Sequence, residues 1–170
     1  MKVKIREEKY LVAIYQLLQS GQNSVSTTDL AKYMDMQAPS VTEMLKKLSR
    51  KQLIHYKKYQ GVTLSDAGCR KALSTLRRHR LWETFLTEKL QFEWHEVHDI
   101  AEQLEQVASQ KLIDSLDRFL GYPTRDPHGY PIPDQSGQLP WQTIPLLELK
   151  EGDRAEIAAV SDHSAQFLEF

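Results

Sequence analysis

Residues 26–50 read STTDLAKYMDMQAPSVTEMLKKLSR, and this stretch decides the expected fold of the first part of the chain. Its opening, Ser26-Thr-Thr-Asp29, has the form of a helix start, with a side-chain oxygen as the cap and an acid three residues later. After this short helix comes a turn at 35–38, and Pro39 then suits the first position of a second helix. Two short helices joined by a tight turn, the second amphipathic and basic, predict a helix-turn-helix.

The flanking residues extend this unit in both directions. Apolar residues recur at helical spacing over residues 5–19 and predict an amphipathic helix. Downstream, residues 53–64 contain two β-prone runs on either side of a basic turn, Lys57-Lys-Tyr-Gln-Gly61, which predicts a β-hairpin wing. Residues 1–65 are therefore expected to form a winged helix-turn-helix, a unit that binds double-stranded DNA.

The rest of the chain is expected to be helical at first and irregular later. Ser65 can cap a long helix over 66–90, and two shorter helices are expected at 94–107 and 109–120. Six of the seven prolines fall between Gly121 and Pro145, which predicts an irregular connector over 123–145. Short alternating runs in 146–170 predict a strand, a turn and a strand. The expected fold class is thus mainly α with a small amount of β.

Charge separates the two halves of the chain. Residues 1–80 hold 16 Lys/Arg against 6 Asp/Glu, and residues 81–170 hold 6 against 17, so that charges of +10 and −11 nearly cancel in the net −1. The first half therefore suits a polyanion and the second half suits cations. No stretch is apolar enough to span a bilayer, and a lone Cys69 excludes an intramolecular disulfide, so we expect a cytoplasmic protein without a membrane partner.

Candidate DNA contacts lie on the second helix of the helix-turn-helix and on the wing. The start of such a helix reaches base edges in the major groove, and the residues there are Gln37, Ala38, Pro39, Ser40, Thr42 and Glu43. Basic residues further along the helix, Lys46, Lys47, Arg50 and Lys51, suit phosphates, as do Lys57, Lys58 and Tyr59 on the wing. The alternative is that these lysines only solvate exposed faces.

Candidate metal ligands recur at helical spacing in the acidic half. His79 and Glu83 are four residues apart, and His98, Glu102 and Glu105 follow at i, i+4 and i+7, so each set shares one helix face. Antiparallel packing of the two helices would gather these imidazoles and carboxylates in one cleft. Mixed nitrogen and oxygen ligands suit Mn²⁺ or Fe²⁺. A surface hydrogen bond is the alternative explanation of an isolated His–Glu pair.

Three motifs resemble those of the diphtheria-toxin-repressor/manganese-transport-repressor family. They are RHRLWE at 78–83, VHDIAEQLE at 97–105 and DPHGYPIP at 126–133, and the resemblance covers nearly the whole chain. It implies a homodimeric repressor that binds operator DNA when loaded with Fe²⁺ or Mn²⁺ and so controls metal homeostasis. It also implies a helical dimerisation and metal-binding domain at 66–122 and the start of an SH3-like domain at 146–170.

The resemblance also assigns metal sites residue by residue. His79, Glu83 and His98 match an ancillary site, and His163 and Gln166, beside Asp162, are the candidates to complete it. Glu102 and Glu105 match a primary site, where a Glu at the first position favours manganese.

Three departures weaken the match at that primary site. Lys9 stands where the family has a Met or Asp ligand, Val12 where manganese-type members have a Glu, and Gln106 where a His is usual. A protonated Lys cannot ligate a metal. One hypothesis is that the Lys9 ammonium takes the place of the cation between Glu102 and Glu105.

The leading interpretation is therefore a metal-dependent repressor and not an enzyme, with no small organic substrate. One alternative is a winged-helix regulator in which metal is structural or absent. A second is a metal-dependent hydrolase using His79, Glu83 and His98, although the sequence offers no Ser or Cys nucleophile near a base and no phosphate-binding loop.

Overall fold

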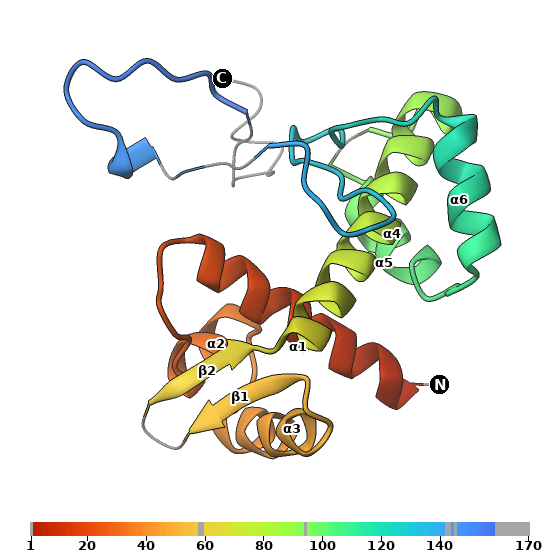
Figure 1. Ribbon diagram of the computed structural model, residues 1–170. Coiled ribbons are helices and arrows are strands. Elements are labelled where there is room, and N and C mark those ends of the chain that lie inside the picture. Colours follow the sequence, from red (N-terminus) through yellow and green to blue (C-terminus); the bar gives the residue numbers. More distant parts are fainter. Residues whose placement is uncertain (1, 58–59, 94, 142–143, 145, 159–170) are drawn as a thin grey trace. The chain divides into compact units, whose positions relative to one another are not determined.

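The computed structural model describes residues 2–57, 60–93, 95–141, 144 and 146–158, and the chain divides into two compact units (Figure 1). The first unit comprises residues 1–73 with 144–149, and the second comprises 74–143 with 150–170. Helix α4 (Asp66–Leu90) runs through both units, because their boundary falls inside it. Among the described residues, no helix is long and apolar enough to cross a membrane.

The first unit is the predicted winged helix-turn-helix. Its elements are α1 (Lys2–Gln19), α2 (Thr27–Tyr33), α3 (Ala38–Arg50), β1 (Ile54–Lys57) and β2 (Gly61–Leu64). The hydroxyl of Ser26 accepts the backbone N–H of Asp29 at 3.0 Å and caps α2, as the sequence predicts. The wing strands pair antiparallel, with Ile54 opposite Leu64, and Val25 forms an isolated bridge to Val62 of β2.

The core of this unit is apolar and draws on every helix and on the wing. Its fully buried side chains include Leu11, Ile14, Leu30, Val41, Leu45, Leu48 and Val62. At the entry to α4, Ser65 accepts the N–H of Gly68, confirming the predicted cap. A Cβ on Gly68 would lie 1.9 Å from the backbone oxygen of Leu53, so this close approach of helix and strand excludes any side chain.

The second unit packs α5 (Val97–Leu104) and α6 (Gln110–Phe119) against α4. Two small apolar clusters join them. One cluster is built on Leu81, Ile113, Leu116 and Ile132, and the other on Leu86, Val97 and Ala101. The expected helices at 94–107 and 109–120 are therefore present, with shorter bounds.

The proline-rich segment differs from the expected connector. Its described residues form no helix or strand, only an isolated bridge between Arg125 and Pro131, but residues 131–133 are buried and Ile132 belongs to the apolar cluster. Arg77 donates to the carbonyl oxygen of Pro133 at 2.9 Å, and Arg80 donates to that of Pro131. Prolines supply carbonyl acceptors without N–H donors, and the two guanidinium groups satisfy two of these acceptors in a buried stretch. The connector is thus an integral part of the second unit over this stretch.

The end of the described chain also departs from expectation. Residues Leu146–Glu148 form a single turn of 3-10 helix (η1) where a strand is predicted, and the described residues 150–158 contain no strand. The remainder of the expected SH3-like start, 159–170, lies outside the described residues.

Candidate metal centre

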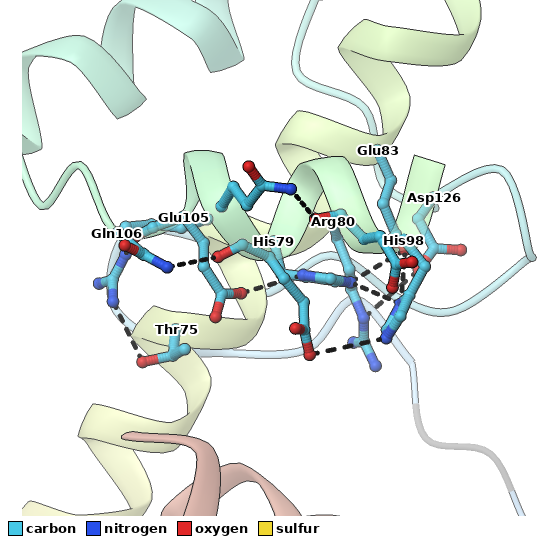
Figure 2. A network of polar contacts seen from close by, with 12 residues as sticks. Thr75, His79, Arg80, Glu83, His98, Glu105, Gln106 and Asp126 are labelled. Carbon is cyan, nitrogen blue, oxygen red and sulfur yellow. Dashed lines mark hydrogen bonds and ion pairs between the residues drawn. The ribbon is translucent and has the colours of Figure 1, made fainter. Parts of the chain in front are cut away.

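The predicted ligands on α4 and α5 come together in the second unit (Figure 2). His79 and Glu83 lie one turn apart on α4, and His98 lies in the first turn of α5. Nε2 of His79 is 2.9 Å from Oε1 of Glu83 and 3.2 Å from Nδ1 of His98, which is itself 3.4 Å from the same carboxylate oxygen. The three ligand atoms lie within 4.8 Å of one another, close enough to bind a single ion.

Burial differs sharply across this cluster. The side chain of Glu83 is 3% exposed and that of His79 is 13% exposed, whereas that of His98 is 60% exposed. The cluster therefore has a buried carboxylate at its base and an imidazole at its open side. Of the three side chains, that of His98 is the one most exposed to solvent.

The neighbouring charges shift the pKa values of His79 and Glu83 in opposite directions. Burial alone would lower the pKa of His79, but hydrogen bonds to Glu105 and Glu83 and their negative charges raise it to about 10. Burial alone would raise the pKa of Glu83, yet hydrogen bonds from His128, His79 and His98 hold it well below its usual value. In this arrangement His79 carries a proton between two carboxylates. An ion that binds Nε2 would compete with a proton for that nitrogen, so metal affinity would rise with pH.

A second set of possible ligands shares Glu83. Its members are Glu83, Asp126 and His128, all buried, and their ligand atoms also lie within 4.8 Å of one another. Oε2 of Glu83 lies 3.7 Å from Nδ1 of His128, while Oε1 faces the first set. Asp126 and His128 belong to the DPHGYPIP motif, but the sequence does not predict them as ligands. Both residues lie in a turn, where side chains do not recur at a regular spacing. Helical spacing therefore could not indicate that they lie near Glu83.

Asp126 is held in place by its own turn and by α4. Its Oδ1 accepts the backbone N–H groups of His128 and Tyr130, both at 2.9 Å, and its Oδ2 lies 3.4 Å from Nε of Arg80. Burial raises the pKa of Asp126 to about 6, and the positive charge of Arg80 opposes that shift. The carboxyl is therefore fixed in position next to Glu83 before any ion binds.

The two glutamates predicted for a primary site contact the histidines of the first set. Oε2 of Glu105 lies 2.9 Å from Nδ1 of His79, and Oε1 of Glu102 lies 3.9 Å from Nε2 of His98. Gln106 is exposed and donates to the backbone oxygen of Glu102 at 3.4 Å. Both carboxylates thus lie beside histidines of the first set.

Other predicted ligands are not placed by the structure. His163, Gln166 and Asp162 lie outside the described residues. Lys9 belongs to the first unit and Glu102 and Glu105 to the second, so the hypothesis that the Lys9 ammonium lies between these two carboxylates stays a prediction.

The donor set of the two clusters fits a divalent cation. It offers imidazole nitrogens and carboxylate oxygens, and among the described residues no sulfur ligand joins either set. Such a combination suits Mn²⁺, Fe²⁺ or Zn²⁺ and disfavours Cu(I).

The predicted DNA-reading end of α3 is exposed in the first unit. Gln37, Ala38, Pro39 and Ser40 are all exposed, while the hydroxyl of Thr42 donates to the backbone oxygen of Ala38 at 2.9 Å. On the same helix Lys46 is exposed and Arg50 donates to the Lys46 backbone oxygen. Lys57 is exposed at the end of β1, and Lys58 lies outside the described residues.

Two of the predicted phosphate contacts have a partner inside the protein. The ammonium of Lys47 lies 3.0 Å from the carboxylate of Glu7 on α1, and that of Lys51 lies 2.8 Å from it. The Glu7 side chain is only 3% exposed, so a buried charge on α1 holds two lysines at the end of α3. The sequence shows no spacing that would predict this contact.

Both units match models of known protein families. A family model described as "Iron dependent repressor, N-terminal DNA binding domain" matches residues 3–62, and one described as "Iron dependent repressor, metal binding and dimerisation domain" matches residues 65–134. A solved structure of a manganese-dependent transcriptional repressor in complex with manganese is 41% identical, with a TM-score of 0.82, and the match covers 96% of this chain and 75% of that one.

Curated relatives agree with this assignment. A helix-turn-helix transcriptional regulator of Methanocaldococcus jannaschii is 32% identical over 113 residues, which is 66% of this chain and 90% of that protein. The diphtheria toxin repressor of Corynebacterium efficiens is 29% identical over 160 residues, 90% of this chain and 69% of that protein. Family models thus match both units, and the relatives are transcriptional regulators that include metal-dependent repressors, so the resemblance drawn from the three motifs is confirmed: the chain belongs to the iron-dependent repressor family.

Proposed function

We propose that this protein is a metal-dependent transcriptional repressor that binds operator DNA as a homodimer in the cytoplasm, with Mn²⁺ or Fe²⁺ as its signal. The observation that carries the proposal is the convergence of His79, Glu83 and His98 in a helical unit that shares α4 with a winged helix. The two family-model matches, one for DNA binding and one for metal binding and dimerisation, support the same division of labour.

The ligands support a divalent site with both imidazole and carboxylate donors. His79, Glu83 and His98 supply three donors, and Asp126 and His128 stand on the other side of Glu83. When bound, the ion would supply positive charge against the buried Glu83 carboxylate. The protein's own part is to keep Glu83 ionised, to hold His79 with Nε2 toward Glu83, and to leave an opening at His98. Imidazole and carboxylate donors together suit Mn²⁺ or Fe²⁺, and the described members of both sets include no sulfur ligand, which softer ions prefer.

Helix α4 supports coupling between metal and DNA. Ala72 of α4 is buried in the apolar core of the winged-helix unit, and His79 follows two turns later on the same helix. The helix that carries metal ligands is therefore also part of the core that supports the DNA-contacting residues. Through this shared helix, metal binding can change the affinity for DNA. In typical allosteric proteins such coupling amounts to about 1–3 kcal/mol, roughly a 5- to 150-fold change in affinity.

The exposed end of α3 supports sequence reading in the major groove. Gln37 and Ser40 offer hydrogen-bonding groups there, and Ala38 and Pro39 offer apolar contact for thymine methyl groups. Lys46, Arg50, Lys57 and Lys58 are proposed for the phosphates. Lys47 and Lys51 share the charge of Glu7, so we propose a smaller phosphate contribution from them than the sequence suggests.

An apolar surface on α6 supports the homodimer. Leu112 is 39% exposed and Phe119 is 64% exposed, and the ring of Phe119 lies 6.2 Å from that of Phe85 on α4. Large apolar side chains that face water on one helix mark an interaction surface. We propose that a second copy of the chain covers this surface.

Metal titration of DNA binding tests the proposal. A duplex selected by the Mn²⁺-loaded protein from a random-sequence library serves as the probe, and fluorescence anisotropy measures its affinity. We expect Mn²⁺ to raise affinity by about tenfold or more over protein held in EDTA. Glu83→Gln removes the shared carboxylate and should abolish that gain, whereas the control His95→Ala, an exposed histidine absent from both ligand sets, should keep it.

Two outcomes contradict the proposal. Full affinity in EDTA would mean that metal is not the signal. An undiminished metal response in Glu83→Gln would mean that the response arises at some other site.

A further inference from the structure

Glu105 has a contact that the ligand sets do not explain. It follows the last turn of α5, its backbone N–H is bonded to the Ala101 oxygen at 2.8 Å, and the residue is only 8% exposed. Its Oε2 lies 2.9 Å from Nδ1 of His79, as the dashed line in Figure 2 marks. Glu105 belongs to neither set of three candidate ligands found among the described residues.

Its position is fixed by α4 as well as by α5. The backbone oxygen of Glu105 accepts Nε of Arg78 at 3.0 Å, and the same guanidinium donates to the hydroxyl of Thr75 at 3.2 Å and to that of Ser74 at 3.3 Å. Arg78 is itself buried. The backbone of Glu105 is therefore held in place by hydrogen bonds, and its carboxylate reaches His79 from this fixed position.

The two nitrogens of His79 face different partners. Nε2 faces Glu83 and His98, which are the other members of its ligand set, and Nδ1 faces Glu105. A neutral imidazole has one lone pair for a metal and one N–H to donate. If Nε2 binds the ion, the remaining N–H is at Nδ1 and points at the Glu105 carboxylate.

We infer that Glu105 is a positioning residue for the metal centre: it accepts the Nδ1–H of His79 and thereby directs Nε2 toward the ion, and it is not itself a metal ligand. This inference rests on the proposed function, since it concerns the same centre. It also changes the assignment of Glu105, which the family resemblance places in a separate primary site.

The substitutions Glu105→Gln and Glu105→Leu separate a positioning residue from a ligand. The amide oxygen of Gln can still accept Nδ1–H, but an amide is a poorer metal ligand than a carboxylate. Leu is similar in size and accepts nothing. Loss of the partner that orients a ligating histidine typically costs 10- to 100-fold in metal affinity.

Isothermal titration of the apo-protein with Mn²⁺ gives the first readout. We expect Glu105→Leu to weaken the affinity by about 10- to 100-fold and Glu105→Gln to stay within about fivefold of the unsubstituted protein. The number of ions bound per chain should be the same in all three. Glu88→Gln serves as the control, because Glu88 is exposed on α4 and belongs to neither ligand set, and it should bind Mn²⁺ as the unsubstituted protein does.

Nitrogen NMR of the Zn²⁺-loaded protein gives the second readout, since Zn²⁺ is diamagnetic. We expect His79 to be bound through Nε2, with a slowly exchanging proton on Nδ1. That proton should persist in Glu105→Gln and exchange rapidly in Glu105→Leu. Thermal unfolding identifies a variant that has lost its fold. If Glu105→Leu does not fold, the metal affinity of Glu105→Gln and the Nδ1 proton of the unsubstituted protein still decide the inference.

Several results overturn it. If Glu105→Gln binds one ion fewer, Glu105 is a ligand. If Glu105→Leu binds Mn²⁺ as tightly as the unsubstituted protein, or if the proton lies on Nε2, Glu105 does not direct the ring. These outcomes leave metal-dependent repression standing, whereas failure of the unsubstituted protein to bind Mn²⁺, Fe²⁺ or Zn²⁺ overturns the proposed function itself.

Discussion

The two units of this protein are stabilised in different ways. The winged-helix unit has one apolar core to which all its helices and its wing contribute, and among the described residues its one buried charge is Glu7. The second unit has only small apolar clusters, but it buries Arg77, Arg78, Arg80, Glu83, Glu105, Asp117, Asp126 and His128. Its interior is therefore largely an ionic network.

The difference follows from what each unit has to hold. A surface that reads DNA needs only a rigid frame, and apolar packing provides one at any pH. A metal centre needs ionised carboxylates away from water, and each buried charge requires a partner of opposite charge or a set of hydrogen bonds. We therefore expect the first unit to be sensitive to changes in volume and the second to changes in charge.

The largest effect should come from Arg77→Met. The substitution keeps an aliphatic chain but leaves the buried Asp117 without its 2.8 Å partner and the Pro133 oxygen without a donor. Removing one member of a buried pair costs about 3–5 kcal/mol. Urea unfolding followed by tryptophan fluorescence measures it, because the described Trp82 and Trp141 belong to the second unit and the chain's third tryptophan, Trp94, lies between them in the sequence.

The matched control is Arg118→Met, an exposed arginine on α6. Surface substitutions of this kind change the free energy of unfolding by about 0.5 kcal/mol or less. Equal losses in the two variants would mean that the buried network contributes no more than surface charge does.

A smaller effect is expected for Gly68→Ala in the first unit. The added Cβ would meet the Leu53 backbone oxygen at 1.9 Å, so strand and helix must separate. Overpacking of this sort costs about 1–3 kcal/mol. Unfolding followed by far-ultraviolet circular dichroism should show this loss equally at low and high salt, and Arg70→Ala, exposed on the same helix, should show almost none. A loss that disappears at high salt would contradict a steric origin.

The smallest effect concerns Glu7, the exception in the first unit. Burial alone would raise its pKa, but hydrogen bonds from Lys51 and Lys47 and their charges hold the pKa below the ordinary 4.5. The carboxylate therefore contributes stability above its unfolded-state pKa, and this contribution is lost as the pH falls through the lowered folded-state pKa. Since both lysines are partly exposed, we expect Glu7→Gln to cost about 1 kcal/mol at neutral pH.

Acid titration of unfolding tests this expectation. The difference between Glu7→Gln and the unsubstituted protein should shrink in acid, where Glu7 is protonated. Glu43→Gln, which alters an exposed glutamate on α3, should change little at any pH. A difference that does not depend on pH would show that Glu7 acts through its shape and not through its charge.

Local patterns in the sequence predict the first unit well and the second unit in part. Helical spacing, the Ser26 and Ser65 caps and the turn at Gly61 are properties of a few neighbouring residues, and the structure confirms them. The same reasoning brings His79, Glu83 and His98 together, because residues four apart share a helix face.

The remaining features depend on contacts between distant residues. Asp126 and His128 come from a turn, and the arginines of α4 would ordinarily be expected at the surface. Nothing near Glu7 in the sequence indicates Lys47 and Lys51, which follow it by 40 and 44 residues. The partners of buried charges come together only when the chain folds. They are distant in the sequence, so no regular spacing of residues indicates them.

The shared helix α4 limits how this protein can be divided. Ala72 completes the apolar core of the winged helix, while Arg77 begins the ionic network of the second unit five residues later. A DNA-binding fragment that stops at Ser65 would lack Gly68 and Ala72, and so part of its own interior. A chimera with a relative would have to be spliced within one turn of α4, in helical register, because a shift of one residue would rotate His79 and Glu83 by about 100° around the helix axis. The regulator is therefore modular in function but not in its covalent architecture.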